Sequence, residues 1–204
     1  GNTKVIINGG IIKTTVSEKG CGSGTIGSGS VEISDKSGFV PTVKVNGEYS
    51  TKSLEEIFKK VKKGYEIEIL TSEAEFPKNL PALNNVTIKG VEGKTTVKTL
   101  AEINADSTNL TFENIEFSQT TDTLKIQGTN VTFNNCDFNA KTLTYDSIKD
   151  TNMYTGGYSM ITSIGAADGN GNDNTKNVTF NGCNFNGDAT GETNFFPNTL
   201  LSAH

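Results

Sequence analysis

Glu116 and Asp137 are the two residues whose type and spacing come closest to catalytic chemistry. Each stands between an apolar residue and a Phe in a repeated phrase of the chain. If these phrases form strands of adjacent turns, the two positions lie about 4.8 Å apart, near the roughly 5–5.5 Å between the carboxyl groups of a retaining glycosidase. Any two acids on stacked strands share this spacing, and outward acids are usually solvated. A solvated pair is therefore the favoured interpretation, and the pair is catalytic only if the protein is an enzyme.

A second candidate is the polar stretch DGNGNDN at residues 168–174. Asp168, Asn170 and Asn172 stand at the first three ligand spacings of a calcium loop. The rest of that motif fails, because Asp173 occupies the usual Gly position and Thr179 stands where the bidentate Glu is needed. A polar loop is the favoured interpretation, with a weak Ca²⁺ site at Asp168, Asn170, Asn172 and Asp173 as the alternative. No other cofactor is indicated.

The third candidate is the long polar excursion at residues 143–159, which separates two copies of the repeated phrase. Long loops on a rigid scaffold often carry binding sites. Tyr side chains offer a flat apolar ring with a polar tip, and Asp side chains accept hydrogen bonds from hydroxyl groups. This composition suits sugar recognition, and packing of the Tyr side chains onto the scaffold is an equal alternative. The candidate ligand-binding residues are Tyr145, Asp146, Asp150, Tyr154 and Tyr158.

A repeated sequence phrase predicts the strands that position these side chains. Its copies are separated by 24, 21 and 47 residues, and they begin at Asn85, Asn109, Asn130 and Asn177. Each copy continues as apolar, Thr, apolar, which is the alternation of a strand whose Thr faces outward. A corner follows at Gly90, Asn114, Asn135 and Gly182, where a left-handed backbone is expected. The 47-residue interval is compatible with one turn or two.

Two inward columns are predicted after the corner. The first contains Val91, Ile115, Cys136 and Cys183, and the second contains Phe117, Phe138 and Phe185. The strand phase also stacks Phe112, Phe133 and Phe180 in the interior. Each repeat begins with an Asn-x-Thr triplet, the pattern of a glycosylation acceptor, but a recurring corner is the favoured explanation for its recurrence. The two inward Cys are expected to be reduced, because stacked side chains point in parallel rather than toward each other.

The phrases TNLTFENIEFSQ, TNVTFNNCDFNA and KNVTFNGCNFNG, with a further short strand before each, resemble the right-handed parallel β-helix of the pectin-lyase-like superfamily over residues 84–185. The resemblance implies an all-β, single-stranded, right-handed parallel β-helix of about four to six turns. This fold hosts lyases, hydrolases, phage tailspikes and adhesins, so the resemblance does not by itself imply an activity.

A capping helix is predicted at residues 53–63. Ser53 and Glu56 form a capping box, an apolar stripe follows, and Gly64 ends the helix. The pattern over residues 45–70 is similar to the entry of β-helical modules in bacterial surface proteins. The predicted organisation is an N-terminal extension or cap at residues 1–45, with a mobile Gly/Ser-rich stretch at 20–30, and a β-helix domain at residues 46–204.

Composition limits the partners and the chemistry. The chain carries a net charge of −5 and contains no Arg, and its one His is His204. No basic block is present, so nucleic acid is not expected as a partner. No apolar run reaches the length of a membrane span. The three Cys do not suggest a disulfide framework or a zinc site.

These observations favour a non-catalytic module at the cell surface or in the extracellular space, where it binds a polysaccharide or mediates adhesion. A signal peptide is then presumed to have been removed. A polysaccharide lyase or glycoside hydrolase with an atypical site is the first alternative, because no Arg or internal His supplies the usual base. A structural stalk of a surface protein or phage tail fibre is the second. The sequence does not indicate an oligomeric state.

Overall fold

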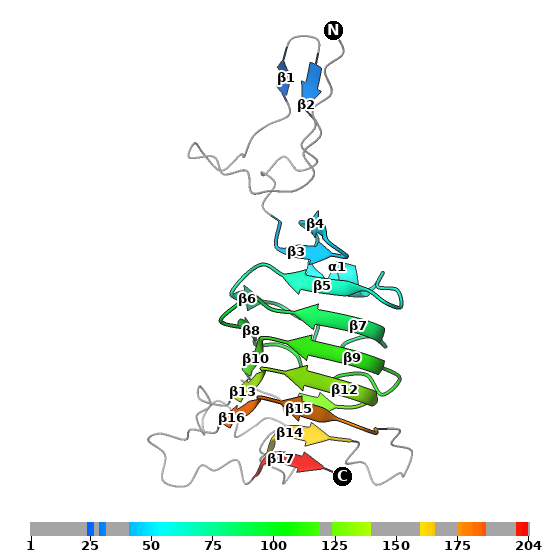
Figure 1. Cartoon of the computed structure of the whole chain (residues 1–204), viewed down its shortest axis with the longest axis vertical. Coiled ribbons are helices and arrows are strands. Elements are labelled where there is room, and N and C mark those ends of the chain that lie inside the picture. Colours follow the sequence, from blue (N-terminus) through cyan, green and yellow to red (C-terminus); the bar gives the residue numbers. More distant parts are fainter. Residues whose placement is uncertain are drawn as a thin grey trace.

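The computed structural model describes residues 24–26, 29–31, 41–118, 124–139, 160–165, 175–186 and 199–203. These residues form a parallel β-solenoid of about three turns with one short helix (Figure 1). The repeat had predicted this class of fold. The expected four to six turns is too high. Three passes of the chain carry a strand in each of three sheets, whereas the two earlier passes reach the third side only through isolated bridges at Asn79 and Glu102.

The first sheet has seven strands in the order β15-β12-β9-β7-β5-β3-β4. Neighbours from β5 to β15 are parallel, while β3 pairs antiparallel with both β4 and β5. The strands are β3 (Val43–Val45), β4 (Glu48–Ser50), β5 (Glu66–Ile69), β7 (Asn84–Lys89), β9 (Thr108–Glu113), β12 (Thr129–Asn134) and β15 (Thr179–Asn181).

The second and third sheets are parallel throughout. The second has the order β16-β13-β10-β8-β6 and consists of β6 (Glu73–Ala74), β8 (Thr95–Val97), β10 (Ile115–Ser118), β13 (Asp137–Asn139) and β16 (Asn184–Asn186). The third has the order β11-β14-β17 and consists of β11 (Leu124–Ile126), β14 (Met160–Ile164) and β17 (Thr199–Ala203). A further strand was expected before each phrase, and β11 and β14 do precede phrases, whereas β17 follows the last one.

The 47-residue interval is a single turn. β12 pairs directly with β15, so Phe133 and Phe180 are partners in register. β13 likewise pairs directly with β16. No further strand of the first or second sheet therefore lies between these partners, and the interval adds one layer to the solenoid.

The interior is filled by two rows of phenylalanine, as the alternation predicted. The rings of Phe112, Phe133 and Phe180 stack with centroids 5.2 Å apart at both steps and interplanar angles of 7° and 9°. Phe117, Phe138 and Phe185 form the second row, with centroid distances of 5.2 and 4.8 Å. The two rows meet edge to face, an arrangement that aromatic quadrupoles favour. The turns that begin with β9, β12 and β15 thus each supply two rings, and Ile88 and Val97 continue the same rows in the preceding turn.

One of the predicted inward columns is wrong at its first position. The partner of Ile115 in the preceding turn is Thr95, which is fully buried, and not Val91, which is half-buried. The reason is a longer corner. β7 and β8 are separated by residues 90–94, whereas Asn114 alone separates β9 from β10. Gly90 is also not left-handed, but a Cβ there would collide with the carbonyl oxygen of Asn114.

The asparagine that opens each repeat builds a ladder along the outside of the solenoid. Each of these residues has a left-handed backbone, with φ between 51° and 57°. The side-chain amide of each donates to the side-chain oxygen of the Asn one turn earlier, at 2.6, 2.8 and 2.9 Å. The members are Asn85, Asn109, Asn130 and Asn177. This supports the corner as the reason that the Asn-x-Thr triplet recurs.

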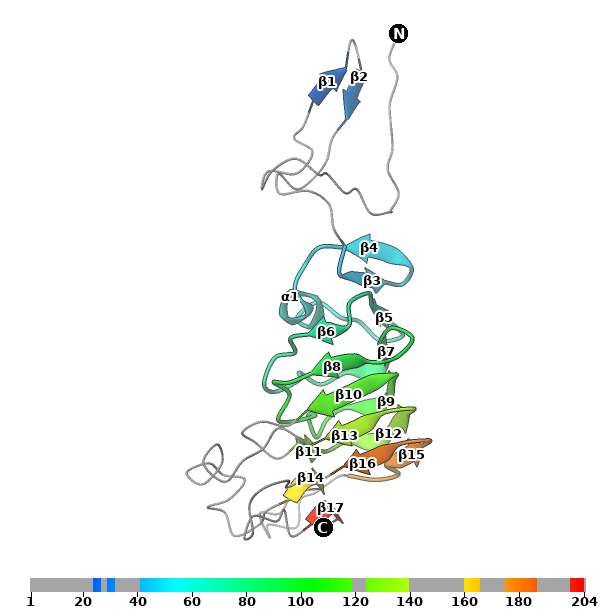
Figure 2. The same ribbon diagram turned by 90° about the vertical axis from the view of Figure 1, so that its left-hand side faces the viewer.

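The N-terminal end of the solenoid is covered by α1 (Leu54–Phe58) and by the β3–β4 hairpin (Figure 2). The capping box between Ser53 and Glu56 is present, as predicted. The helix itself is much shorter than the expected 53–63, since it ends at Phe58 and has no basic residue in its last turn. Leu54, Ile57 and Phe58 are buried in the core, so packing rather than length holds α1 in place.

Two other differences lie near the N-terminus. The first sheet already contains β3, so the solenoid's hydrogen bonding begins at Val43. Within and just after the Gly/Ser-rich stretch, β1 (Gly24–Ile26) and β2 (Gly29–Val31) pair as an antiparallel hairpin, which the sequence analysis did not predict.

Candidate functional site

Glu116 and Asp137 are neighbours in register on β10 and β13, as the repeat predicted. Both are half-buried on the outer side of the second sheet. The column continues to Thr96 on one side and to Asn184 on the other. The structure therefore brings the two predicted acids together in one row, and Thr96 separates them from a third acid, Glu73.

Asp137 is already engaged by partners that the sequence did not suggest. Its Oδ1 atom lies 2.6 Å from the Nζ atom of Lys94, and it accepts a hydrogen bond of 2.8 Å from the Nδ2 atom of Asn184. The side chains of Lys94 and Asp137 are only 16% and 17% exposed. Because two donors already bind the Oδ1 atom of Asp137, this carboxyl is poorly placed to act on a glycosidic bond.

Lys94 was missed because it belongs to no repeated column. It lies in the longer corner between β7 and β8, where its own φ is 82° and that of Gly93 is 92°. Left-handed backbone at a residue other than Gly, Asn or Asp is uncommon. The only sequence signal was the extra length of the corner, together with its Gly-Lys pair.

Cys136 and Cys183 stand next to this column and are both free thiols, as predicted. Their Sγ atoms donate to different backbone carbonyls, that of Cys136 to Asn134 at 3.4 Å and that of Cys183 to Phe133 at 3.4 Å. Burial raises the pKa of the Cys136 thiol to about 12 and also raises the pKa of Cys183. Neither thiol is activated as a nucleophile, because the thiolate is the reactive form.

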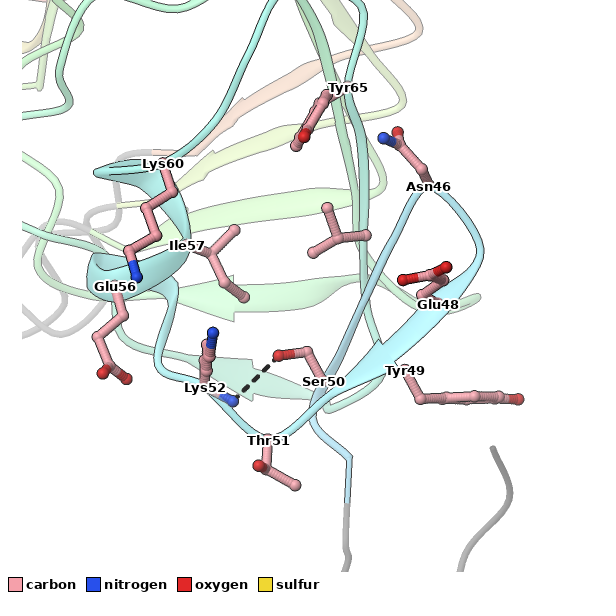
Figure 3. A pocket seen from close by; sticks show the side chains of 11 residues that line it. Asn46, Glu48, Tyr49, Ser50, Thr51, Lys52, Glu56, Ile57, Lys60 and Tyr65 are labelled. Atoms are coloured by element: carbon pink, nitrogen blue, oxygen red, sulfur yellow. Dashed lines mark hydrogen bonds between the residues drawn. The ribbon is translucent and has the colours of Figure 1, made fainter. Parts of the chain in front are cut away.

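A pocket of about 560 Å³ lies at the N-terminal end, between the β3–β4 hairpin and α1 (Figure 3). Val45 and Ile57 give it an apolar floor, and the ring of Tyr65 lies over one side. Its volume falls within the range of small-ligand sites. Sequence analysis did not predict this pocket, because its walls come from segments on either side of the helix and from no repeated column.

Charged groups surround the pocket on two sides. Lys52 and Lys60 line the side formed by α1, and Glu48 lines the side formed by the hairpin (Figure 3). Glu56 also borders the pocket, but its carboxylate accepts hydrogen bonds from the backbone N–H and the hydroxyl of Ser53. The hydrogen bond from the backbone N–H of Ser53 lowers the pKa of Glu56 most, and the bond from the Ser53 hydroxyl lowers it further. The carboxylate of Glu56 is thus bound within the capping box, and Lys52 and Lys60 are the cationic side chains that line the pocket.

Tyr49 marks the rim of the pocket. It is the one large hydrophobic side chain that is exposed in the described part of the chain, at 37%. The Nζ atom of Lys44 lies 5.0 Å from the centre of its ring. Figure 3 shows the ring of Tyr49 directed away from the pocket, whereas the ring of Tyr65 is directed over it.

The other predicted site residues lie outside the described ranges. These are the ligand-binding candidates Tyr145, Asp146, Asp150, Tyr154 and Tyr158, and the calcium candidates Asp168, Asn170, Asn172 and Asp173. Within the part of the chain that is described, no group of three or more His, Cys, Asp or Glu side chains could hold a metal ion. In that same part, no helix has the length and apolar character needed to cross a membrane.

The chain was compared with protein-family models, curated proteins and solved structures, and none of them matches it.

Proposed function

We propose that this chain is a non-catalytic β-solenoid module of the pectin-lyase-like type, acting outside the cell or at the cell surface, and that it binds a polysaccharide or another glycan. The observation that carries the proposal is the pocket at the cap. It combines the face of an aromatic ring, Tyr65, with charged and hydroxyl-bearing side chains around an apolar floor. Sugar rings present an apolar face and a polar edge, so a site of this composition matches both.

The pairing of Asp137 supports the non-catalytic part of the proposal. Glycoside hydrolysis of the retaining type needs one carboxyl that donates a proton and one that attacks carbon. Asp137 is bound by Lys94 and Asn184, so Glu116 stands beside a carboxylate that is not free to take either role. The solenoid then acts as a rigid support that presents the cap.

The runner-up function is a lyase or hydrolase with an atypical site. One observation favours it: Lys94 places an amine beside the acidic column, and a Lys can act as a general base when its charge is lost. The second alternative, a structural stalk, predicts neither binding nor turnover.

A glycan array followed by calorimetric titration tests the proposal. Wild-type protein should bind at least one glycan, and Tyr65→Ala should weaken that binding at least tenfold because the stacking surface is lost. Tyr49→Ala is the matched control, since its ring points away from the pocket and its removal should leave the affinity within about twofold. Binding that is unaffected by Tyr65→Ala would move the site elsewhere, and the absence of any binding would favour the stalk.

Turnover is tested separately on the glycans that bind. Release of reducing ends and formation of unsaturated products should both be absent, with and without Ca²⁺. Activity that disappears in Glu116→Gln would contradict the non-catalytic assignment and favour the lyase or hydrolase.

A further inference from the structure

The ion pair between Lys94 and Asp137 differs from the other ion pairs of the molecule. Of the pairs between two described residues it is the shortest, at 2.6 Å, and by far the most shielded. The remaining pairs lie 2.7 to 3.8 Å apart, and each has at least one side chain that is a third or more exposed. Exposed pairs of that kind contribute little. The Lys94–Asp137 pair combines close approach with partial shielding from water, and both favour a chemical step between its members.

The backbone delivers Lys94 to this position at a conformational cost. Its left-handed φ of 82° is unfavourable for a residue with an unbranched side chain and no local hydrogen-bonding group. β8, which Lys94 precedes, pairs with β10, and β10 pairs with β13. The amine of Lys94 therefore crosses the level of β10, where Glu116 stands, and reaches a carboxyl two strands away.

We propose that Lys94 and Asp137 condense to form an intramolecular isopeptide bond. Because Oδ1 is bonded directly to Cγ, the Nζ atom lies within about 4 Å of the carbon it would attack. Transfer of one proton from Nζ to the carboxyl converts the ion pair into a neutral amine and a carboxylic acid, a change that a shielded site makes less costly. Groups held in this way react with effective concentrations of roughly 10⁵–10⁸ M.

The step balances without an oxidant or another reactant. The lone pair of Nζ forms the new bond to Cγ, a second proton leaves the nitrogen, and the Cγ–OH bond breaks with release of one water molecule. Asn184 donates to Oδ1 and so stabilises the negative charge that develops on that oxygen. Glu116 stands in register beside Asp137, on the strand that the Lys94 side chain crosses, and is the candidate for the group that carries the proton from nitrogen to the leaving hydroxyl.

The bond would join the corner before β8 to β13, and it would span β10, the strand between them. The described cysteines are free thiols, so this link would take the place that a disulfide takes in other extracellular folds. It closes a loop of the chain between β8 and β13, so the conformational entropy of the unfolded state would be lower. The inference does not depend on the glycan-binding proposal, because a module with any function can carry such a link.

The intact mass of the denatured full-length wild-type protein tests this inference. It should be lower than the mass calculated from the sequence by one water molecule, and a protease digest should contain one branched peptide joining Lys94 to Asp137. Lys94→Arg keeps the charge but should restore the full mass. Lys98→Arg is the matched control, because Lys98 pairs with Glu73 at the surface. This variant should still be lighter than its calculated mass by one water molecule.

Two outcomes would overturn the inference. The first is a wild-type mass equal to the calculated one after prolonged incubation at neutral pH, which would leave an ion pair only. The second is a deficit that persists in Lys94→Arg. Glu116→Gln tests the relay: the bond should form more slowly and its rate should lose the pH dependence seen in the wild type, whereas a merely structural role would leave that pH profile unchanged.

Discussion

The repeated turns and the N-terminal cap bury their apolar side chains in different ways. In the turns, one residue type returns to one position, and the rings of Phe112, Phe133 and Phe180 stack almost parallel. In the cap, a five-residue helix and an antiparallel hairpin close the end of the solenoid with side chains of mixed shape. The edge-to-face contact of Phe58 with Phe76, at 5.4 Å, is a single contact and is not repeated.

The difference shows where a solenoid can place a binding site. Regular turns satisfy one another, as in the asparagine ladder, and so leave few groups free for a ligand. At the N-terminal end the repeat stops, and the β3–β4 hairpin and α1 do not pack closely against each other. A pocket of about 560 Å³ lies between them. The longer corner that carries Lys94 is a second interruption, and it holds the most shielded ion pair in the described part of the chain. Function in this fold is expected at interruptions rather than in the repeat.

The largest expected effect is at the centre of the stacked row. Phe133→Ala removes a fully buried ring that contacts rings above and below it, and it should cost about 3–5 kcal/mol of the free energy of unfolding. Urea denaturation followed by circular dichroism measures this loss. A loss below about 1 kcal/mol would show that the interior row does not carry the stability assigned to it.

A smaller effect is expected in the asparagine ladder. Asn130→Ala removes two side-chain hydrogen bonds, of 2.8 and 2.9 Å, and leaves a left-handed backbone at a residue that disfavours it. The loss should be about 1–3 kcal/mol. Asn130→Gly should recover part of it, since Gly accepts the backbone but not the bonds.

Asn46 in the cap is the comparator for this ladder position. Its φ is 50°, and its Oδ1 atom accepts one hydrogen bond of 2.8 Å from the backbone N–H of Glu66. Asn46→Ala should therefore destabilise the protein less than Asn130→Ala in the same denaturation experiment. An equal or larger loss at Asn46 would contradict the view that stacked repeats reinforce one another.

Alkaline pH should reveal the buried thiol of the repeat. Burial raises the pKa of Cys136 to about 12 in the folded protein, above its ordinary value of 9.0, so between these values the unfolded chain holds fewer protons. Stability due to this thiol is complete below pH 9 and is lost as the pH rises toward 12. The loss should reach about 1 kcal/mol by pH 9.5.

Two variants assign this loss to Cys136. Cys136→Ala should flatten the fall in unfolding free energy between pH 8 and pH 9.5, measured by urea denaturation at each pH. Cys183→Ala should flatten it less, because Cys183 is only partly buried. The assignment fails if both variants retain the wild-type slope.

The smallest effect on stability is expected at the rim of the pocket. Tyr49 is 37% exposed and its ring points outward, so Tyr49→Ala should change the free energy of unfolding by no more than about 0.5 kcal/mol. Thermal unfolding measures the change. A loss comparable with that of Phe133→Ala would show that the cap is as tightly coupled to the core as the turns are.

The sequence alone determined the features that follow from local periodicity. Apolar-Thr-apolar phrases predicted strands, their recurrence predicted stacked turns, and the phase of each Phe predicted the two interior rows. The register of Glu116 with Asp137 and the free state of two cysteines followed from the same phase. Each of these depends on residues a few positions apart and on a repeat that the sequence displays directly.

Only the tertiary structure decided the features that depend on interruptions. Lys94 meets Asp137 because a longer corner directs its side chain across a neighbouring strand, and no spacing in the sequence encodes that path. α1 ends at Phe58 although the helical pattern continues to Gly64, and the pocket is lined by segments on both sides of this helix. The single turn within the 47-residue interval was likewise decided by pairing of β12 with β15. Contacts between distant segments compete with local preference, and their outcome is visible only in the folded chain.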